Sequence, residues 1–209
     1  MITITKPGCG CTTANRYLVA MRSVLVAALA LAAASCSPPS FNGVVLEPPE
    51  KAPALRLSDS TGAAFDLGQQ GGKVVLVFFG YTHCPDVCPT TLVDWRHVAD
   101  SLGTSARDVR FVFVSVDPAR DTPALAQRYA ARFAPDFVGL TGTAAQIDAL
   151  KSAWQIASFR DGAASDTTST YTVTHPSQVF VIDRDGKLRL MQRPGLTVAQ
   201  VAADIRALL

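Results

Sequence analysis

Two cysteines separated by three residues are the feature of this sequence that most directly suggests chemistry. Cys84 and Cys88 lie in FGYTHCPDVCPTTL, residues 79–92, between an apolar run and an expected helix. The positive end of a helix dipole stabilises a thiolate, so cysteines placed here are reactive. Such a pair can bind one metal ion or close a small disulfide ring. A purely structural disulfide is disfavoured, because so short a ring removes little chain entropy.

Three histidines are candidates for a further ligand. His175 lies in YTVTHPS, directly before an expected core strand. His83 adjoins Cys84 but would point away from it in an extended segment. His97 falls inside the helix that follows the cysteines, where a surface or packing role is more common. The residues alone favour His175 but leave open whether it reaches the cysteines.

Two thiolates and one imidazole would form a definite set of metal donors. Sulfur ligands favour Cu(I), and imidazole also suits Cu(II), so this set can hold both oxidation states. Structural zinc normally has four such ligands, and only three are in sight. Three ligands leave a site open for transfer to a partner. We therefore expect copper, Cu(I), Cu(II) or both, at Cys84, Cys88 and His175.

The elements expected around these residues predict an α/β fold. Apolar runs and helical spacing give the order strand, strand, helix, strand, helix, strand, helix, strand, strand, helix. The expected strands are 64–67, 73–80, 109–116, 137–140, 178–183 and 187–192, and the expected helices are 90–101, 121–133, 144–154 and 198–208. A βαβ start joined to a ββα finish is the thioredoxin pattern, here with an inserted strand and helix. We expect a central mixed sheet flanked by helices.

The same pattern places the less regular segments. Residues 160–172 are polar and rich in Ser and Thr, so we expect a loop or a protruding hairpin there. In a thioredoxin-like topology, the loop before strand 178–183 packs beside the cysteine loop. This would bring His175 toward Cys84 and Cys88.

Residues 1–36 differ from the rest of the chain. They hold three basic and no acidic residues, whereas the whole chain has a net charge of +2. From Met21 a basic start, an apolar run and a small-residue exit are typical of a secretory signal. We therefore expect translation to start at Met21 and a signal peptide over residues 21–35. The sequence AASC resembles a bacterial lipoprotein box, which favours a lipid on Cys36 over simple cleavage or an uncleaved anchor.

The composition of residues 37–209 predicts a tether and one domain, and it excludes some classes of protein. Residues 37–53 contain five prolines, so we expect a tether to the membrane-attached leader, followed by one exported domain over residues 54–209. A hydrophobic content of 48% excludes a disordered chain. Residues 37–209 carry a net charge of −1, which gives no support for a nucleic-acid partner, since phosphates require a clustered basic surface.

These motifs resemble the Sco/SenC family of copper chaperones. The resemblance covers roughly residues 47–209 and rests on the cysteine motif, on SVDPARDTP at residues 115–123, and on His175 before a strand and an Asp-Gly hairpin. It implies a thioredoxin-like fold that binds copper through the two cysteines and His175. The chain departs from the family pattern at Thr174, where an acid is common, and at Pro176, where Ser or Thr is common.

The resemblance also implies partners and a location. Copper would pass to the CuA-bearing subunit of cytochrome c oxidase, at the outer face of the bacterial inner membrane or in the periplasm. A copper donor would be a second partner. Because an exported compartment is oxidising, we also expect a membrane-tethered thioredoxin-like reductant that keeps the thiols reduced.

Two functions share the cysteine pair. The first is a metallochaperone without turnover, and the second is a thiol-disulfide oxidoreductase that uses Cys84 and Cys88 as a redox-active disulfide pair to keep the recipient's cysteines reduced. They differ at His175, which only copper binding needs. A peroxidase of the peroxiredoxin type is disfavoured, because Cys88 would trap an oxidised Cys84 at once.

Two acidic residues are candidates for a supporting role. Asp86, between the cysteines, could tune their pKa or meet a partner, or could simply face solvent. Asp117 follows the second buried strand and should lie near the cysteine loop. The preferred explanation of its segment is a contact between Asp117 and Arg120, with Asp121 capping the next helix.

Overall fold

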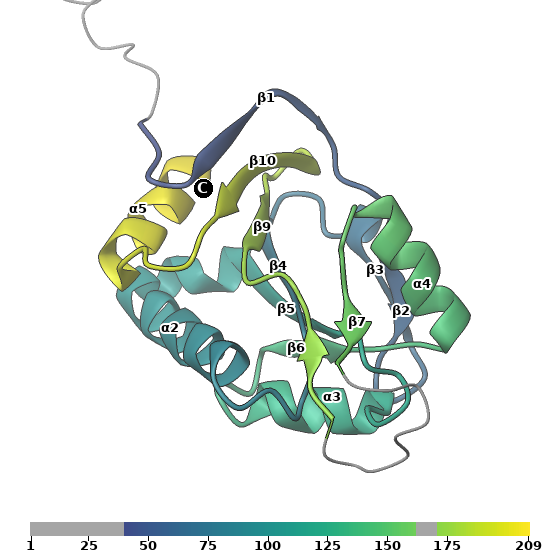
Figure 1. The fold of residues 1–209 in the computed structure, drawn as a ribbon. Helices are drawn as coiled ribbons and strands as arrows, with labels where there is room; N and C mark the ends of the chain where they lie inside the picture. The colour runs from purple at the N-terminus through teal and green to yellow at the C-terminus, as the bar shows by residue number, and fades with distance from the viewer. Residues whose placement is uncertain (1–39, 162–170) are drawn as a thin grey trace, which may run out of the picture. The chain divides into compact units, whose positions relative to one another are not determined.

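The computed structural model describes residues 40–161 and 171–209 (Figure 1). The expected start at Met21, the signal peptide 21–35 and the lipid site Cys36 lie outside these residues. Within the described ranges, no helix combines the length and apolar character needed to cross a membrane.

A six-stranded mixed sheet forms the centre of the domain. Its strands, in spatial order, are β1 (Val44–Lys51), β10 (Lys187–Gln192), β9 (Val179–Ile182), β4 (Val74–Gly80), β5 (Val109–Ser115) and β6 (Val138–Leu140). β4, β5 and β6 are parallel, whereas β9 is antiparallel to β4, and β10 and β1 continue in antiparallel order. The mixed sheet predicted from the sequence is confirmed, with five of the expected strands in it; the expected strand at residues 64–67 is β3 (Ala64–Asp66), which lies outside this sheet.

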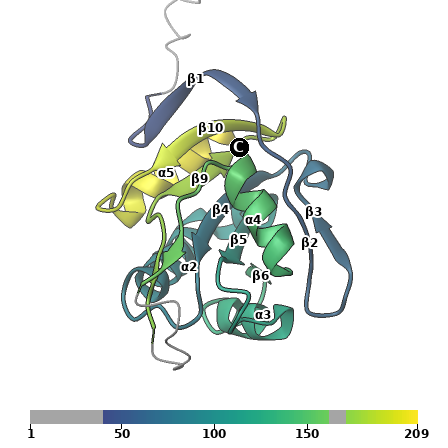
Figure 2. The ribbon, with the colours of Figure 1, turned by 45° about the vertical axis from the view of Figure 1, so that its right-hand side comes forward.

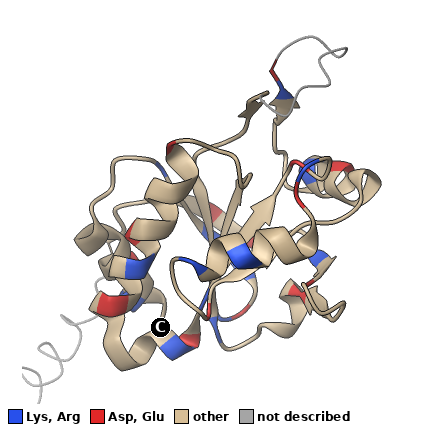
Figure 3. Ribbon diagram, turned by 90° about the horizontal axis from the view of Figure 1, so that it is seen from below, with Lys and Arg blue, Asp and Glu red and all other residues tan. Residues whose placement is uncertain are grey.

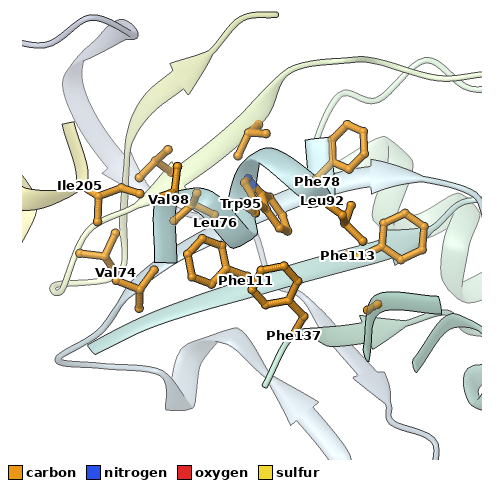
Figure 4. Close-up of a cluster of buried hydrophobic side chains, with 14 of the residues drawn as sticks. Val74, Leu76, Phe78, Leu92, Trp95, Val98, Phe111, Phe113, Phe137 and Ile205 are labelled. Atoms are coloured by element: carbon orange, nitrogen blue, oxygen red, sulfur yellow. The ribbon is translucent and has the colours of Figure 1, made fainter. Parts of the chain in front are cut away.

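Both faces of the sheet are covered, so the central strand β4 is buried along its whole length. Its even-numbered side chains pack with α2 (Val87–Leu102), α3 (Pro123–Ala131) and α5 (Val198–Leu208), as Figure 4 shows for Phe78 and Trp95. Its odd-numbered side chains pack with α4 (Ala144–Ala153). This double burial explains the uninterrupted apolar sequence of the strand.

Smaller elements complete the second face. A hairpin of β2 (Arg56–Ser58) and β3 (Ala64–Asp66) leads into the short helix η1 (Leu67–Gln69), beside α4 in Figure 2. A further short helix, η2 (Gly103–Asp108), joins α2 to β5.

Charged residues of both signs are mixed over the domain. Lys and Arg positions are interspersed with Asp and Glu positions along the ribbon (Figure 3), in agreement with the near-neutral charge of residues 37–209.

Two helix starts differ from the sequence prediction. α2 begins at Val87, three residues earlier than expected, because Pro89 fits the first turn of a helix, where its missing N–H has no partner to lose. Cys88 therefore lies inside the helix. The prediction that Asp121 caps α3 is wrong: Thr122 is the N-cap, and its hydroxyl accepts from the N–H of Leu125.

The expected tether over residues 37–53 is wrong for Val44–Lys51. These residues form β1, whose Val44 and Val45 lie opposite Met191 and Leu190 of β10. Pro48 and the following proline fall where the pairing register shifts, and an edge strand tolerates proline at such irregular positions. The folded unit therefore begins near Ser40 rather than at residue 54.

A loop or a protruding hairpin is expected at residues 160–172, of which residues 162–170 lie outside the described ranges, and the segments that flank it pair with each other. β7 (Phe159–Arg160) pairs antiparallel with β8 (Val173–Thr174). The hydroxyls of Thr172 and Thr174 both donate to the Asp161 carboxylate, at 2.9 Å in each case. Thr174, which stands where family members often have an acid, thus holds the base of this hairpin.

Candidate metal centre

Three donor atoms converge at the carboxyl edge of the parallel strands. Cys84 lies in the loop after β4, Cys88 in the first turn of α2, and His175 between β8 and β9. Their sulfur and ring-nitrogen atoms all lie within 4.8 Å of one another, and Cys88 Sγ is 3.6 Å from His175 Nε2. The fold therefore brings together the three residues that the sequence singled out, although His175 lies 87 positions after Cys88.

The three donors differ in exposure. Cys88 is fully buried in the core beneath the site, whereas Cys84 and His175 are each partly exposed. Gly80, at the end of β4, provides the space for Cys88: a Cβ atom there would lie 2.4 Å from Cys88 Sγ. Sequence reasoning did not assign a role to Gly80, although a glycine that ends a buried strand is a recognisable sign of close approach.

Cys84 is held as a thiolate. Its pKa is lowered to about 3, first by a hydrogen bond from the Cys88 thiol and then by one from His175. The backbone N–H groups of Asp86 and Cys88 add to this effect. The N-cap residue Asp86 makes no capping hydrogen bond through its own side chain. The Cys84 sulfur instead accepts hydrogen bonds from the backbone N–H groups at the start of α2.

Cys88 behaves in the opposite way. Burial raises the pKa of its thiol far above the usual range, and its hydrogen bond to Cys84 and the negative charge there raise it further. Neither cysteine forms a disulfide, and their opposite pKa shifts place the single proton of the pair on Cys88. The reduced site thus presents one partly exposed thiolate and one buried thiol.

The imidazole of His175 is oriented by its surroundings. Nδ1 lies 3.0 Å from the carbonyl oxygen of Pro176, and since a carbonyl can only accept, Nδ1 is protonated and donates. Nε2 faces the sulfur atoms: when protonated it donates to the Cys84 thiolate, and it must lose that proton to bind a metal. The ring stands edge-on to Phe78 and Tyr81, with centroid separations of 5.9 and 5.5 Å.

The pKa of His175 reflects opposing effects. Burial lowers it, but the hydrogen bonds to Cys84 and to the Pro176 carbonyl, together with the negative charge on Cys84, raise it on balance. The imidazole is therefore electrostatically coupled to the thiolate.

Asp121 holds the cysteine loop in place through hydrogen bonds from Thr82. Its buried carboxylate accepts from the backbone N–H of Thr82 at 2.9 Å, from the Thr82 hydroxyl at 2.6 Å and from the Ser115 hydroxyl at 2.5 Å. Sequence reasoning missed this role, because the motif around Asp121 also fits a helix cap.

Asp117 belongs to a second polar cluster. It accepts from Arg120 Nε at 2.5 Å, which confirms the predicted contact, and from the Tyr171 hydroxyl at 2.7 Å. Arg120 also donates to the Tyr171 carbonyl at 2.8 Å, and its guanidinium lies 3.5 Å from the centre of the Tyr171 ring. Arg160 covers that ring at 3.7 Å. Asp117 therefore acts on Tyr171, two residues before β8, and makes no direct bond to a donor atom among the described contacts.

The remaining candidates lie outside the donor cluster. Asp86 is exposed, and its contribution comes from its backbone rather than its carboxylate. His83 is half-exposed, with Nδ1 3.6 Å from Asp121 and 3.1 Å from the Thr82 hydroxyl. His97 is exposed on α2, as expected.

The fold and the donor cluster together define a thioredoxin-like protein with a two-cysteine, one-histidine metal-ligand cluster. Comparison with known proteins agrees, since the SCO1/SenC family profile matches residues 46–209. The chain belongs to the SCO1/SenC family.

Individual relatives show how far this similarity extends. A SCO2-like protein of Rickettsia felis is 34% identical over 133 residues, which cover 64% of this chain and 64% of that protein. The structure of apo Sco1 from Thermus thermophilus is 35% identical, with a TM-score of 0.74, and the match covers 82% of this chain and 98% of that one. The copper-bound structure of Bradyrhizobium japonicum ScoI is also 35% identical, with a TM-score of 0.68, and the match covers 77% and 99% of the respective chains.

Proposed function

We propose that the protein binds one copper ion through Cys84, Cys88 and His175 and delivers it to the CuA centre of cytochrome c oxidase during assembly of that enzyme. The observation that carries the proposal is the convergence of two sulfurs and one imidazole nitrogen within 4.8 Å. This donor set suits copper in both oxidation states. The relative from Bradyrhizobium japonicum, whose structure contains copper, supports the choice of metal.

Unequal exposure of the ligands suits transfer. Cys88 is enclosed by the core, while Cys84 and His175 are each partly exposed. An incoming ligand from a partner can replace the accessible donors first and Cys88 last. A closed structural site, by contrast, would surround the metal with four protein ligands.

The proposal is tested by an anaerobic Cu(I) titration of the reduced full chain against a competing chelator. We expect one tightly bound copper per chain, and an affinity at least tenfold lower in His175→Ala. His97→Ala is the matched control, because this exposed histidine should leave the affinity unchanged. Weak binding that does not depend on His175 would refute the copper site.

A second function, thiol-disulfide exchange, is favoured by the different pKa values of the two thiols. The Cys84 thiolate can attack a disulfide of the recipient, and Cys88 can then resolve the mixed disulfide, so that two electrons pass to the recipient's cysteines. In a deletion strain, rescue of oxidase activity by added copper supports delivery. Rescue by a small thiol reductant alone supports reduction.

We propose further that residues 21–36 direct export and that Cys36 carries a lipid. The domain would then work in the periplasm at the outer face of the inner membrane, with a copper donor and a membrane-tethered thioredoxin-like reductant as partners. Mass spectrometry of the N-terminal peptide of the mature protein tests this. A peptide that begins at a diacylated Cys36 is expected, and one from residues 1–20 would contradict it.

A further inference from the structure

One segment contacts both halves of the donor cluster. Residues 115–121 leave the end of β5 and turn back toward α3, and they contact both the cysteine loop and Tyr171 in the segment that leads to His175. The turn is closed internally, since the N–H of Asp121 donates to the Asp117 carbonyl at 2.9 Å and the N–H of Asp117 to the Ser115 hydroxyl at 3.2 Å. It is therefore a compact unit rather than a free loop.

The cysteine side of this unit is Asp121. All three hydrogen bonds to its carboxylate come from Thr82 or from Ser115, so the carboxylate ties the residue two before Cys84 to the end of β5. The next turn is closed by the N–H of Cys84, which donates to the Tyr81 carbonyl at 3.2 Å. Hydrogen bonds to a charged and buried acceptor are the stronger kind, so Thr82 has little freedom to move.

The histidine side of the unit is the pair formed by Asp117 and Arg120. Together they hold Tyr171 by its hydroxyl, its carbonyl and the face of its ring. Arg120 also lies 5.6 Å from the ring centre of Tyr81, against which the imidazole of His175 packs. The planar guanidinium makes several directed contacts at once, which a lysine cannot reproduce.

We propose that residues 115–121 form a positioning bracket, in which Asp121 fixes the cysteine loop and Asp117 with Arg120 fixes Tyr171 in the segment that leads to His175, so that one turn sets the spacing of the three copper ligands. The inference rests on the proposed copper site and deepens it. Asp121 and Arg120 are positioning residues, because neither contacts the donor atoms of the cluster in a described hydrogen bond. The bracket explains why ligands so distant in sequence stay close without a disulfide or a shared helix.

A purely stabilising role for Asp121 can be separated from positioning by a matched control. Asp204 on α5 is equally buried and also accepts three hydrogen bonds, from the N–H of Asn42 at 2.7 Å, from its side-chain amide at 2.9 Å and from the N–H of Gly43 at 2.9 Å. It anchors the start of β1 instead of the cysteine loop. Asp121→Asn and Asp204→Asn should therefore lose similar stability.

Copper affinity distinguishes the two variants. In the anaerobic Cu(I) competition with the full chain, we expect Asp121→Asn to bind about tenfold more weakly, which corresponds to about 1.4 kcal/mol. Asp204→Asn should remain within about twofold of the unsubstituted protein. If Asp121→Asn does not fold, Thr82→Val removes only the hydroxyl donor and should show a smaller loss in the same direction. Equal affinities for Asp121→Asn and Asp204→Asn would overturn the proposal.

Metal-free measurements keep the bracket testable even if copper binding fails. Because His175 lies edge-on to Phe78 and Tyr81, ring currents shift its proton resonances. We expect these shifts to move toward random-coil values in Arg120→Lys and to persist in Arg206→Lys, where the guanidinium bonds Ser101 between α5 and α2.

Hydrogen exchange provides the corresponding test at the cysteine loop. The N–H of Cys84 should exchange faster in Asp121→Asn than in Asp204→Asn at equal global stability. Loss of copper binding in the unsubstituted protein, with these two signatures intact, would refute the proposed function and leave the bracket standing. Unchanged His175 shifts and unchanged Cys84 exchange would refute the bracket alone.

Discussion

Replacing Gly80 with alanine tests how tightly the site is built into the core. The added Cβ atom would lie 2.4 Å from Cys88 Sγ and 2.9 Å from Phe113 Cε2, whereas ordinary contacts begin near 3.4 Å. Gly80 does not have a positive φ, so alanine fits its backbone and the effect is purely steric. The Cys88 sulfur would have to move by about 1 Å.

Two consequences follow from this displacement. Overpacking of a well-filled core costs about 1–3 kcal/mol, so Gly80→Ala should lower the free energy of unfolding by about 2 kcal/mol. Metal–ligand distances tolerate deviations of only about 0.2 Å, so a displaced Cys88 should also weaken copper binding by tenfold or more. Denaturant unfolding measures the first quantity, and Cu(I) competition measures the second.

A double-mutant cycle identifies the cause. In a Cys88→Ala background the sulfur is absent and the closest contact is lost, leaving Phe113 at 2.9 Å and Phe78 at 3.3 Å from the new methyl group, so the cost of Gly80→Ala in stability should fall by at least half. An equal cost in both backgrounds would refute the steric argument. Undiminished copper affinity in the single variant would show that Cys88 is not held in place by Gly80.

Other predictions follow from the same structure. Because the pKa of Cys84 is about 3, its alkylation by iodoacetamide should be nearly independent of pH between about 5 and 8, with Cys88 unlabelled, whereas a steep rise toward pH 8 would contradict the thiolate. Since that pKa lies below its usual value of 9.0, the thiolate stabilises the fold fully above pH 9 and progressively less as the pH falls toward 3; Cys84→Ser should remove this part of the pH dependence of unfolding. Gly139→Ala would place Cβ 2.1 Å from the Ala126 carbonyl and should cost about 3 kcal/mol or more by forcing α3 off β6, as denaturant unfolding can verify. Thr197→Ala removes the capping box of α5 and should cost about 1 kcal/mol in the same assay, with unchanged copper affinity as its check.

The main elements of the fold were predictable because their local patterns are strong. The all-apolar β4 could only be a strand buried on both faces, and Thr143 with a glutamine three residues later marked the start of α4 as a capping box. Element order then fixed the thioredoxin-like topology.

The error at β1 shows where local pattern fails. Its proline content is typical of a linker, and only pairing with β10, far along the chain, makes Val44–Lys51 a strand. The prolines fall at the shift in register, which no local pattern reveals. Long-range pairing therefore overrode composition at this edge of the sheet.

The donor residues were identifiable from sequence, but their arrangement was not. Chemistry singles out Cys84 and Cys88, and topology suggests His175, yet nothing local distinguishes Asp121 as a helix cap from Asp121 as an anchor of the cysteine loop. In either role the Asp121 carboxylate, next to Thr122 in the sequence, would accept hydrogen bonds from backbone N–H groups. The choice depends on whether Thr82 is within reach, which is a property of the folded sheet.

The position of the donor cluster follows from the sheet topology together with local hydrogen bonds. Parallel strands β4 and β5 end at the same edge, which sets the cysteine loop beside residues 115–121, and antiparallel β9 begins at that edge, which delivers His175. Topology alone leaves loops free to vary by several ångströms, far more than metal coordination tolerates. The buried carboxylates of Asp117 and Asp121 supply the remaining precision, because each accepts directed hydrogen bonds from a loop that carries a ligand. The sheet thus brings the three proposed ligands close together, and in the proposed bracket the polar turn after β5 sets the distances between them.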